Sequence, residues 1–379
     1  MRSWQPGQTV EMTRRAQKPG SPGRGPAVTM SDIAKAAGVS QSTVSRILND
    51  TPLSIPLSAK TRERVLALAL EFGYRPHPIA RALRGAPTML LGAVVRDVTD
   101  LFFASAIEAI SIEARRSGYS VVLGHAREQA DEALALAAVL EARQCDAIVL
   151  FGDLRDQPRL IEDLRNARIP VVGLWHGSDT SNDGFRKVGV DNRAGIRFAL
   201  QHLVELGHRR IAFVRGPALG DMREREAAYD EYMAEQETPL PPGYVKRVQN
   251  TTGGGELALG ELLALPEPPT AIVAATDVLA IGVIHGAYER GLSVPTQLSV
   301  VGFDDIPLAS ATVPGLTTVR MPIAKMVAAA VKLAIGTNAR RDMDQPSEPV
   351  IFKPKLIVRR STAPVEAASE DSSPRRRQG

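Results

Sequence analysis

The stretch Met30–Asp50, MSDIAKAAGVSQSTVSRILND, predicts two short helices joined by a tight turn. Its apolar residues recur at the spacing that places them on one side of each helix: Ala34, Ala37, Val39, Val44 and Leu48. Gly38 follows the first helix, where a left-handed cap needs no Cβ, and Ser40 precedes the second helix as its N-cap. A helix, a short turn with glycine and a second helix form the helix-turn-helix pattern.

The second of these helices presents a polar face. With Val44 and Leu48 directed inward, the residues that point outward are Gln41, Ser42, Ser45 and Arg46. They lie at the N-terminal end, the part of a recognition helix that contacts base edges in the major groove. A helical hairpin that binds no DNA would fit the same pattern. The next segment predicts a third helix over Ser58–Phe72, with Ser58 as N-cap and four apolar residues, Val65, Leu66, Ala69 and Leu70.

Together these segments resemble the DNA-binding headpiece and hinge helix of the lac-repressor-like (LacI/GalR) bacterial regulators: VTMSDIAKAAGVSQSTVSRILND, SAKTRERV and GYRPHPIARAL. The resemblance covers Val28 to Thr362 and continues through LLGAVVRDVTDLFFA, VGVDNRAG, LVELGHRRIAFV and ATDVLAIGV. It implies an N-terminal all-α helix-turn-helix headpiece, followed by an α/β periplasmic-binding-protein-like core of two doubly wound subdomains. It also implies a transcriptional repressor, not an enzyme, whose affinity for its DNA operator is controlled by a small-molecule effector.

The domain organisation follows from composition and from this resemblance. We expect a disordered basic tail (1–27), the headpiece (28–75), a hinge helix with linker (76–88), the core (89–363) and a second disordered tail (364–379). Within the core, subdomain 1 is expected over about 89–190 and 318–349, and subdomain 2 over about 191–317 and 350–363. Residues 1–88 hold 13 Lys and Arg against 5 Asp and Glu, a net of +8 in a chain of net charge +4. A basic first quarter is typical of a nucleic-acid-binding module.

From Leu90 onward, short β-branched runs alternate with helical patterns, which predicts parallel α/β layers. Strands are expected over 90–95, 120–124, 147–151, 171–174, 188–190, 210–214, 244–248, 271–274 and 298–302. Helices are expected over 103–116, 132–142, 159–166, 193–206, 223–235, 256–263 and 278–289. Two such sheets in tandem leave a crevice at the carboxyl ends of their strands, where ligands bind.

The expected DNA contacts combine the polar face, the helix ends and the motif positions of the hinge: Thr29, Ser40, Gln41, Ser42, Thr43, Ser45, Arg46, Asn49, Lys60, Arg62, Ala80, Arg81, Leu83 and Arg84. Thr29 is the expected cap of the first helix, and Lys60 and Arg62 are expected to contact phosphates. By resemblance, two hinge helices pair across a dimer and Leu83 wedges between base pairs in the minor groove.

The expected partners follow from this arrangement. A two-fold dimer imposes its symmetry on the double-stranded DNA operator, which should therefore be pseudo-palindromic. By resemblance, the chain is expected to be a homodimer or a tetramer. Its one cysteine, Cys145, fits a reducing compartment, so we expect the protein in the cytoplasm. No membrane partner is expected, since no apolar run approaches the about 18 residues that span a bilayer.

The expected effector-binding residues lie at strand ends that face the crevice: Asp100, Phe102, Trp175, His176, Arg225, Asn250, Asp277 and Asp305. Four more residues are candidates at the crevice: Asp97 and Asp304 follow strands, and Asp191 and Asn192 open a helix. By resemblance, Arg225 and Asp277 match the family's effector contacts best, although Asp277 is also a good N-cap for the next helix. The effector is expected to be sugar-like or a purine. Arg96 and Asp100 replace a proline and an amide of the family's pattern, so the effector carries charge or is an unusual sugar.

Two alternative functions compete with this interpretation. Gly253–Ala258, GGGELA, fits the Gly-x-Gly-x-x-Ala motif of nicotinamide-dinucleotide oxidoreductases, with Asp277 about 20 residues on. Four residues separate it from the preceding strand, however, and an oxidoreductase leaves the headpiece unexplained. The core also suits a solute-binding protein of a transporter, which would need an export signal and no headpiece. The six histidines have no ligand-like spacing, so neither a metal nor a cofactor is expected.

Overall fold

The computed structural model describes residues 28–48, 58–74, 87–95, 98–125, 145–152, 162, 169–174, 185–217, 220–236, 241–336 and 348–365. The chain divides into two compact units, Met1–Arg84 and Gly85–Gly379. The expected helices at 132–142 and 159–166 lie outside the described residues, apart from the helical Glu162. Both expected disordered tails lie outside them too, except for Pro364 and Val365.

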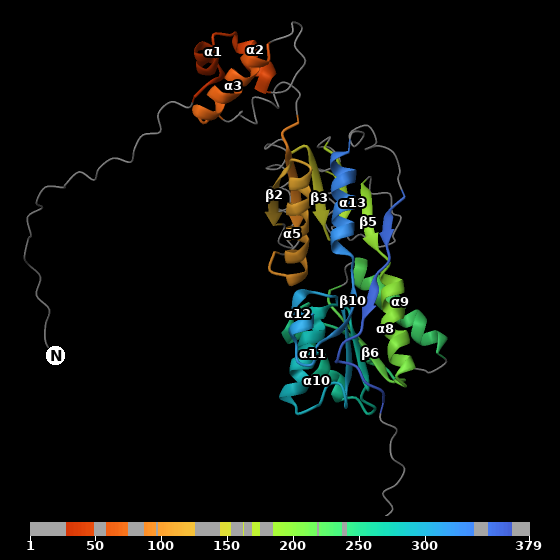
Figure 1. Cartoon of the computed structure of the whole chain (residues 1–379). Coiled ribbons are helices and arrows are strands. Elements are labelled where there is room, and N and C mark those ends of the chain that lie inside the picture. The colour runs from red at the N-terminus through yellow and green to blue at the C-terminus, as the bar shows by residue number, and fades with distance from the viewer. Residues whose placement is uncertain are drawn as a thin grey trace, which may run out of the picture. The chain divides into compact units, whose positions relative to one another are not determined.

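The described part of the first unit consists of helices α1 (Met30–Ala37), α2 (Gln41–Leu48) and α3 (Ala59–Glu71), which pack on one another (Figure 1). They share one small apolar core: Ile33, Ala34, Ala37, Val44, Ile47, Val65 and Ala69. Ile47, which was not expected, is the second fully buried residue of α2, and the expected Leu48 packs against the same core while half-buried. Two residues of the expected apolar face of α3 are instead exposed, Leu66 at 44% and Leu70 at 85%.

The second unit contains two sheets, each with six strands among the described residues. The first sheet is parallel throughout, and its order is β11 (Val350–Phe352), β5 (Arg186–Val190), β4 (Val171–Leu174), β3 (Ala147–Phe151), β1 (Leu90–Val95) and β2 (Ser120–His125). The central strands are continuous apolar runs, as expected where helices cover both faces. In register, Ala93 of β1 lies between Leu123 and Val149.

The second sheet repeats this plan with one antiparallel edge. Its order is β12 (Lys355–Ile357), β10 (Thr317–Arg320), β9 (Ser299–Asp304), β8 (Ala271–Ala274), β6 (Ile211–Arg215) and β7 (Val245–Arg247). The chain crosses back to the first subdomain only after β10, which belongs to the second sheet, and returns only after β11, which belongs to the first. Both boundaries therefore lie a few residues beyond the subdomain limits expected at 318 and 350. β9 also continues to Asp304, two residues past its expected end.

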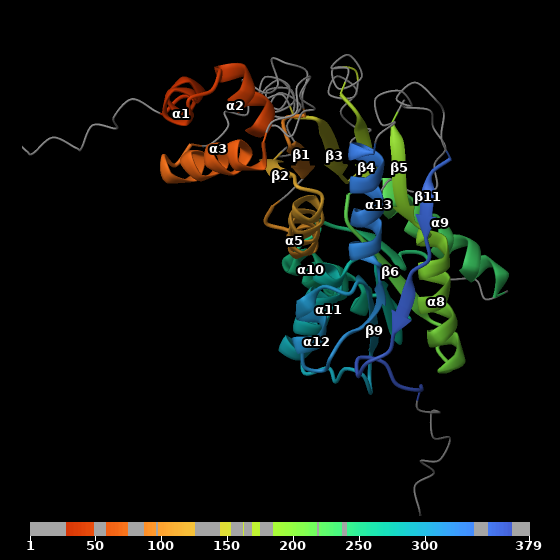
Figure 2. The ribbon, with the colours of Figure 1, turned by 45° about the horizontal axis from the view of Figure 1, so that its top comes forward.

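Helices cover both sheets. Those of the second unit are α5 (Leu101–Arg116), α8 (Asn192–Glu205), α9 (Gly220–Glu235), α10 (Thr252–Leu263), α11 (Asp277–Glu289), α12 (Pro307–Ala311) and α13 (Ile323–Ile335). α5 packs against α13 over the first sheet, and α10 and α11 lie on the opposite side of the second sheet from α8 and α9 (Figures 1 and 2). None of the helices in the described residues is long and apolar enough to cross a membrane.

Candidate functional site

The caps of the headpiece helices are those expected from the residues. Thr29 forms a capping box with Asp32: the Asp32 amide donates to Thr29 Oγ1 (3.4 Å), and the Thr29 amide donates to Asp32 Oδ2 (2.9 Å). The Thr29 hydroxyl also donates to Asp32 Oδ2 (2.7 Å), and this bond, together with that from the Thr29 amide, lowers the pKa of the Asp32 carboxyl. Gly38 has φ +63°, the left-handed conformation that glycine adopts without strain. The Thr61 amide donates to Ser58 Oγ (3.2 Å), so Ser58 caps α3.

The polar face of α2 is accessible. Gln41, Ser42 and Arg46 are exposed, Thr43 and Ser45 are half-buried, and Val44 is completely buried beneath them. Ser40 accepts a hydrogen bond from the Thr43 amide (3.2 Å), which confirms it as the N-cap. Lys60 and Arg62 are exposed in the first turn of α3. The remaining predicted DNA contacts lie outside the described residues: Asn49, Ala80, Arg81, Leu83 and Arg84.

The second unit contains a pocket of about 460 Å³ where strands of the two sheets end. Its polar and charged lining comes from strand ends and helix starts: Thr99, Asp100, Asn192, Asp221, Arg225, Gln249, Asn250, Thr251, Thr252, Thr276 and Asp304. Its apolar lining includes Leu101, Phe102, Phe103, Val190, Pro217, Met222, Val278 and Met321. A concave site with this mixture is the usual form of a small-molecule pocket.

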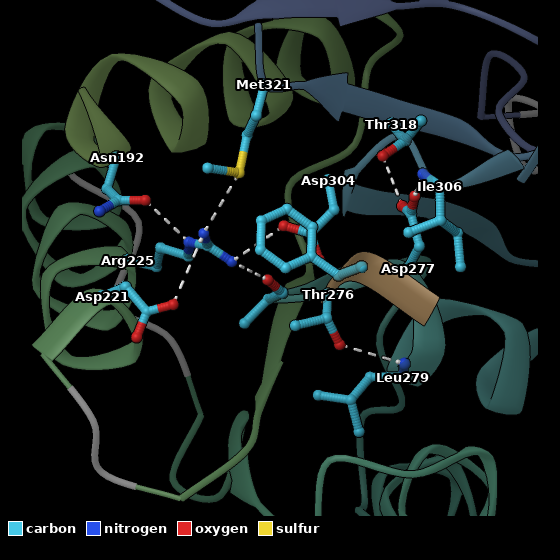
Figure 3. A network of polar contacts seen from close by, with 12 residues as sticks. Asn192, Asp221, Arg225, Thr276, Asp277, Leu279, Asp304, Ile306, Thr318 and Met321 are labelled. Carbon is cyan, nitrogen blue, oxygen red and sulfur yellow. Dashed lines mark hydrogen bonds and ion pairs between the residues drawn. The ribbon is translucent and has the colours of Figure 1, made fainter. Parts of the chain in front are cut away.

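Arg225 is the centre of a polar network at this pocket (Figure 3). Its side chain is 3% exposed; Nε donates to Asn192 Oδ1 (2.9 Å) and Nη1 donates to the carbonyl of Ala275 (2.5 Å). Nη1 lies 3.7 Å from Asp304 Oδ1, and Nη2 lies 3.7 Å from Asp221 Oδ2. Arg225 therefore ties together α8, α9 and the ends of β8 and β9.

A second chain of contacts joins the two subdomains beside this network. Asn250 Nδ2 donates to Asp100 Oδ2 (3.4 Å), and Thr276 Oγ1 donates to Asn250 Oδ1 (2.7 Å). Asp100 also caps α5 by accepting from the Phe102 amide (2.9 Å). The pocket wall is thus continuous from the first sheet's helix α5 to the end of β8.

The pocket includes four of the predicted effector residues: Asp100, Phe102, Arg225 and Asn250. Trp175 and His176 lie outside the described residues. Two further candidates, Asn192 and Asp304, also line the pocket, and the lining residues that the sequence reasoning missed include Asp221, Met222, Thr276 and Met321. The spacing of Asp221, four residues before Arg225 on one helix, was an available signal. No signal in the sequence pointed to Met321, because its side chain reaches the pocket only through the crossover after β10.

The structure directs Asp277 and Asp305 away from the pocket. Asp277 is completely buried and accepts hydrogen bonds from the Ile306 amide (2.8 Å) and from the Thr318 hydroxyl (Figure 3). The helix cap is the preceding residue, Thr276, which accepts from the Leu279 amide (3.3 Å). Asp305 forms ion pairs with Arg320 and Arg359. Both carboxylates therefore hold the second sheet and its neighbouring turns together, and we do not include them among the proposed effector contacts.

Burial of Asp277 leads to a pH-dependent expectation. Burial raises the pKa of Asp277 to about 7, against about 3.9 in an unfolded chain. Between about pH 4 and pH 7 the folded protein therefore holds a proton that the unfolded chain has released, so this carboxyl lowers stability progressively over that range and no further above about pH 7. Asn resembles the protonated acid, because its oxygen can accept from Ile306 and its amide can donate to Thr318. We expect Asp277→Asn to gain stability relative to the wild type as the pH rises to about 7, by at most about 1.4 kcal/mol per pH unit, and the gain to level off above that pH.

Urea unfolding of both proteins between about pH 5 and pH 8 measures this difference. A difference that stays constant over the range would show that Asp277 keeps an ordinary pKa in the folded protein.

The glycine-rich segment has a packing role. Gly255 faces α11, where a Cβ would lie 2.2 Å from the carbonyl oxygen of Leu279. Gly282 faces α10 in return, where a Cβ would lie 2.0 Å from the carbonyl oxygen of Thr252. These glycines allow the backbones of α10 and α11 to approach closely, so they account for the motif without a dinucleotide. Among the residues that the structure describes, no group of three His, Cys, Asp or Glu side chains could hold a metal ion.

Comparison with known proteins covers nearly the whole chain. The family model of bacterial regulatory proteins of the lacI family matches residues 29–77, and a periplasmic binding protein-like domain matches residues 200–362. Catabolite control protein A of Priestia megaterium is 33% identical over 88% of this chain and 99% of its own length. The HTH-type transcriptional regulator GalS of Salmonella typhimurium is 33% identical over 89% of this chain and 97% of its own. A lac repressor dimer bound to operator and an anti-inducer aligns with a TM-score of 0.78 at 26% identity, covering 89% of this chain and all of that one.

Proposed function

Since the chain belongs to the lacI family of bacterial regulatory proteins, it is a DNA-binding transcriptional regulator and not an enzyme, and we propose that it acts as an effector-controlled repressor in the bacterial cytoplasm. Its operator is double-stranded and pseudo-palindromic, because a homodimer presents two headpieces related by two-fold symmetry. The observation that carries the proposal is the exposed polar face of α2, on a small headpiece whose three described helices each have an N-cap, in the same chain as a ligand pocket.

We assign base recognition to Gln41, Ser42 and Arg46. These side chains are exposed at one end of α2, and their donors and acceptors suit the pattern that base pairs present in the major groove. Lys60 and Arg62 are exposed at the start of α3, where they can neutralise phosphates and set the register. The family resemblance adds Leu83 and its neighbours as minor-groove contacts, and the proposed limits of the headpiece and hinge are those expected from the sequence, 28–75 and 76–88.

We assign effector recognition to Asp100, Asn192, Asn250, Arg225 and Asp304. All five line the pocket, and their side chains supply acceptors and donors for hydroxyl groups, while Phe102 and Met321 offer apolar contact. The effector is sugar-like. Asn250 bridges Asp100 and Thr276 across the two subdomains, so a ligand that rearranges this bridge changes how the subdomains meet. Coupling between effector and operator then follows from two arrangements of the core with different affinities for DNA.

Replacing Arg46 by alanine is expected to relax base preference. The loss of a bidentate contact to one base pair of each half-site costs about 1–3 kcal/mol of discrimination. Lys60→Ala is the matched control on the neighbouring helix. The loss of a phosphate contact should weaken binding to all sequences alike and reduce the slope of log K against log salt concentration by about 1. Selection of binding sites from random duplexes, followed by salt titration, separates the two. If Arg46→Ala keeps the base preference of the wild type, Arg46 does not take part in base recognition.

The function itself is tested by a thermal-shift screen of the full chain with sugars, polyols and purines, followed by binding to promoter fragments with and without each compound that stabilises the protein. A repressor binds one pseudo-palindromic fragment selectively, and an effector changes that affinity. Binding that depends only on charge, for every duplex and with every compound, would overturn the proposal.

A further inference from the structure

The described pocket lining carries more negative than positive charge. Its ionisable side chains are Asp100, Asp221, Asp304 and Arg225, three carboxyl groups against one guanidinium. The acids come from three separate elements, the start of α5, the start of α9 and the end of β9, and all face the same cavity. In a partly dehydrated site such charges act strongly on a ligand.

The one cation of this described lining is already engaged. Arg225 donates to the Asn192 amide oxygen and to the Ala275 carbonyl, and its two terminal nitrogens lie near Asp304 and Asp221. One face of the guanidinium rests on the Phe303 ring, 3.7 Å from the ring centroid. A phosphate or carboxylate ligand needs the planar fork of an arginine for bidentate binding. Here Nε and Nη1 already donate to protein oxygens, Nη2 faces the Met321 sulfur, and the charge is balanced by two nearby carboxyl groups.

The helix starts at the pocket offer little compensation. Amides in the first turns of α5, α10 and α11 donate to the capping side chains of Asp100 (2.9 Å), Thr251 (3.0 Å) and Thr276 (3.3 Å). Helix N-termini attract anions through their unpaired amides and their dipoles. At α5 a carboxylate occupies that place, and Asp221 lies in the first turn of α9.

Asp304 provides an acceptor that the described protein does not use. Its side chain is 7% exposed, and its contact among the described residues is the 3.7 Å ion pair with Arg225, which is too long for a hydrogen bond. Burial raises the pKa of Asp304 well above its ordinary value, although Arg225 opposes this shift. A buried carboxyl group of this kind is stabilised by a hydroxyl or amine donor from a ligand and destabilised by a further negative charge.

We propose that this pocket selects an uncharged, polyhydroxylated effector with one apolar face and excludes its phosphorylated or acidic counterparts. The inference rests on the proposed regulatory function and deepens it. Hydroxyl groups of the effector donate to Asp304 and Asp221, and its apolar face contacts Phe102, Met222 and Met321. Asp100 and Asp221 repel an anion that enters the same space, and the buried Asp304 disfavours any further negative charge beside it.

The first experiment measures inorganic phosphate binding to the full chain by titration calorimetry. The wild type is expected to bind phosphate weakly, and Asp221→Asn with Asp304→Asn together are expected to tighten binding by about tenfold, because removing the two acidic groups beside Arg225 leaves its positive charge uncompensated. Asp221→Asn alone, at a half-exposed position, should give part of this gain if the double variant folds poorly. Glu231→Gln is the matched control, since it removes a charge on the outer side of the same helix, where Glu231 pairs with Arg193. Equal phosphate affinity in all four proteins, including none in any, would overturn the role of these carboxyl groups.

The second experiment uses matched ligand pairs: glucose with glucose 6-phosphate, ribose with ribose 5-phosphate, and adenosine with its monophosphate. Compounds that raise the melting temperature should be the uncharged members, and each acidic partner should bind at least about tenfold more weakly. Tighter binding of an acidic member, or no binding by any uncharged member, would contradict the inference. Operator binding by the wild type is measured in the same preparations. If the wild type does not bind operator, the proposed regulatory function is wrong, whatever the phosphate titration shows.

Discussion

Gly282→Ala is expected to destabilise the second subdomain by about 3 kcal/mol or more. The added Cβ would lie 2.0 Å from the carbonyl oxygen of Thr252 and 2.7 Å from its carbonyl carbon. Both atoms belong to backbone, so relief requires α10 and α11 to move apart, and this overpacking costs about 1–3 kcal/mol or more. Separation would also open the buried contact around Gly255, which faces α11 at the same crossing. Urea unfolding followed by circular dichroism measures the loss.

Gly253→Ala is the matched control for this prediction. Gly253 is exposed in the same glycine run, and its nearest contact for an added Cβ is Thr251 Oγ1 at 3.9 Å. Alanine there should change stability by less than about 1 kcal/mol, and in the favourable direction, because it restricts the unfolded chain and suits a helix. If both variants unfold like the wild type, the helices tolerate separation and the packing role assigned to the run is wrong.

Arg225→Ala is expected to abolish effector control of operator binding. The change removes six contacts at once: those to Asn192, Asp221, Ala275, Asp304, Met321 and the Phe303 ring. It also leaves Asp304 buried without its cation, and breaking a buried pair in this way costs about 3–5 kcal/mol. Effector affinity should fall by about 100-fold or more, because the network that shapes the pocket is lost. Operator binding is measured with and without the effector found in the screen.

Arg223→Ala, two residues earlier on α9 and exposed, tests whether the effect is specific to the buried arginine. It should keep both operator binding and its response to the effector. Arg225→Lys keeps the positive charge and fills the space, but it cannot reproduce the donors to Asn192 and Ala275 together. If Arg225→Lys responds to the effector as the wild type does, the geometry of the guanidinium is not needed and the proposed pocket is misplaced.

The residues that decide local structure could be identified from their neighbours along the chain. Thr29, Gly38, Ser40 and Ser58 act on amides or dihedral angles within three residues of themselves, so their roles were predicted and are confirmed. Continuous apolar runs predicted four strands with the observed limits: 90–95, 147–151, 171–174 and 271–274. The family, the headpiece and the repeated α/β pattern could also be identified from short segments in order along the chain. Each segment is recognisable from its own residues, without knowledge of what it contacts in the fold.

The three acids at the ends of β8 and β9 show what only the tertiary structure decided. Asp277, Asp304 and Asp305 all follow buried strands, and their sequence context does not separate them. The backbone turns sharply at the end of β9, where Asp304 has φ +115° and Asp305 has φ +58°, so these two neighbouring carboxyl groups point to different surroundings. Asp304 meets Arg225 at the pocket, whereas Asp305 meets Arg320 and Arg359, and Asp277 meets Thr318. Every one of these partners lies more than ten residues away in the chain. Caps and strands depend on nearby residues and are legible in the sequence, but the direction of a side chain at a strand end depends on distant segments that only the packed fold brings together.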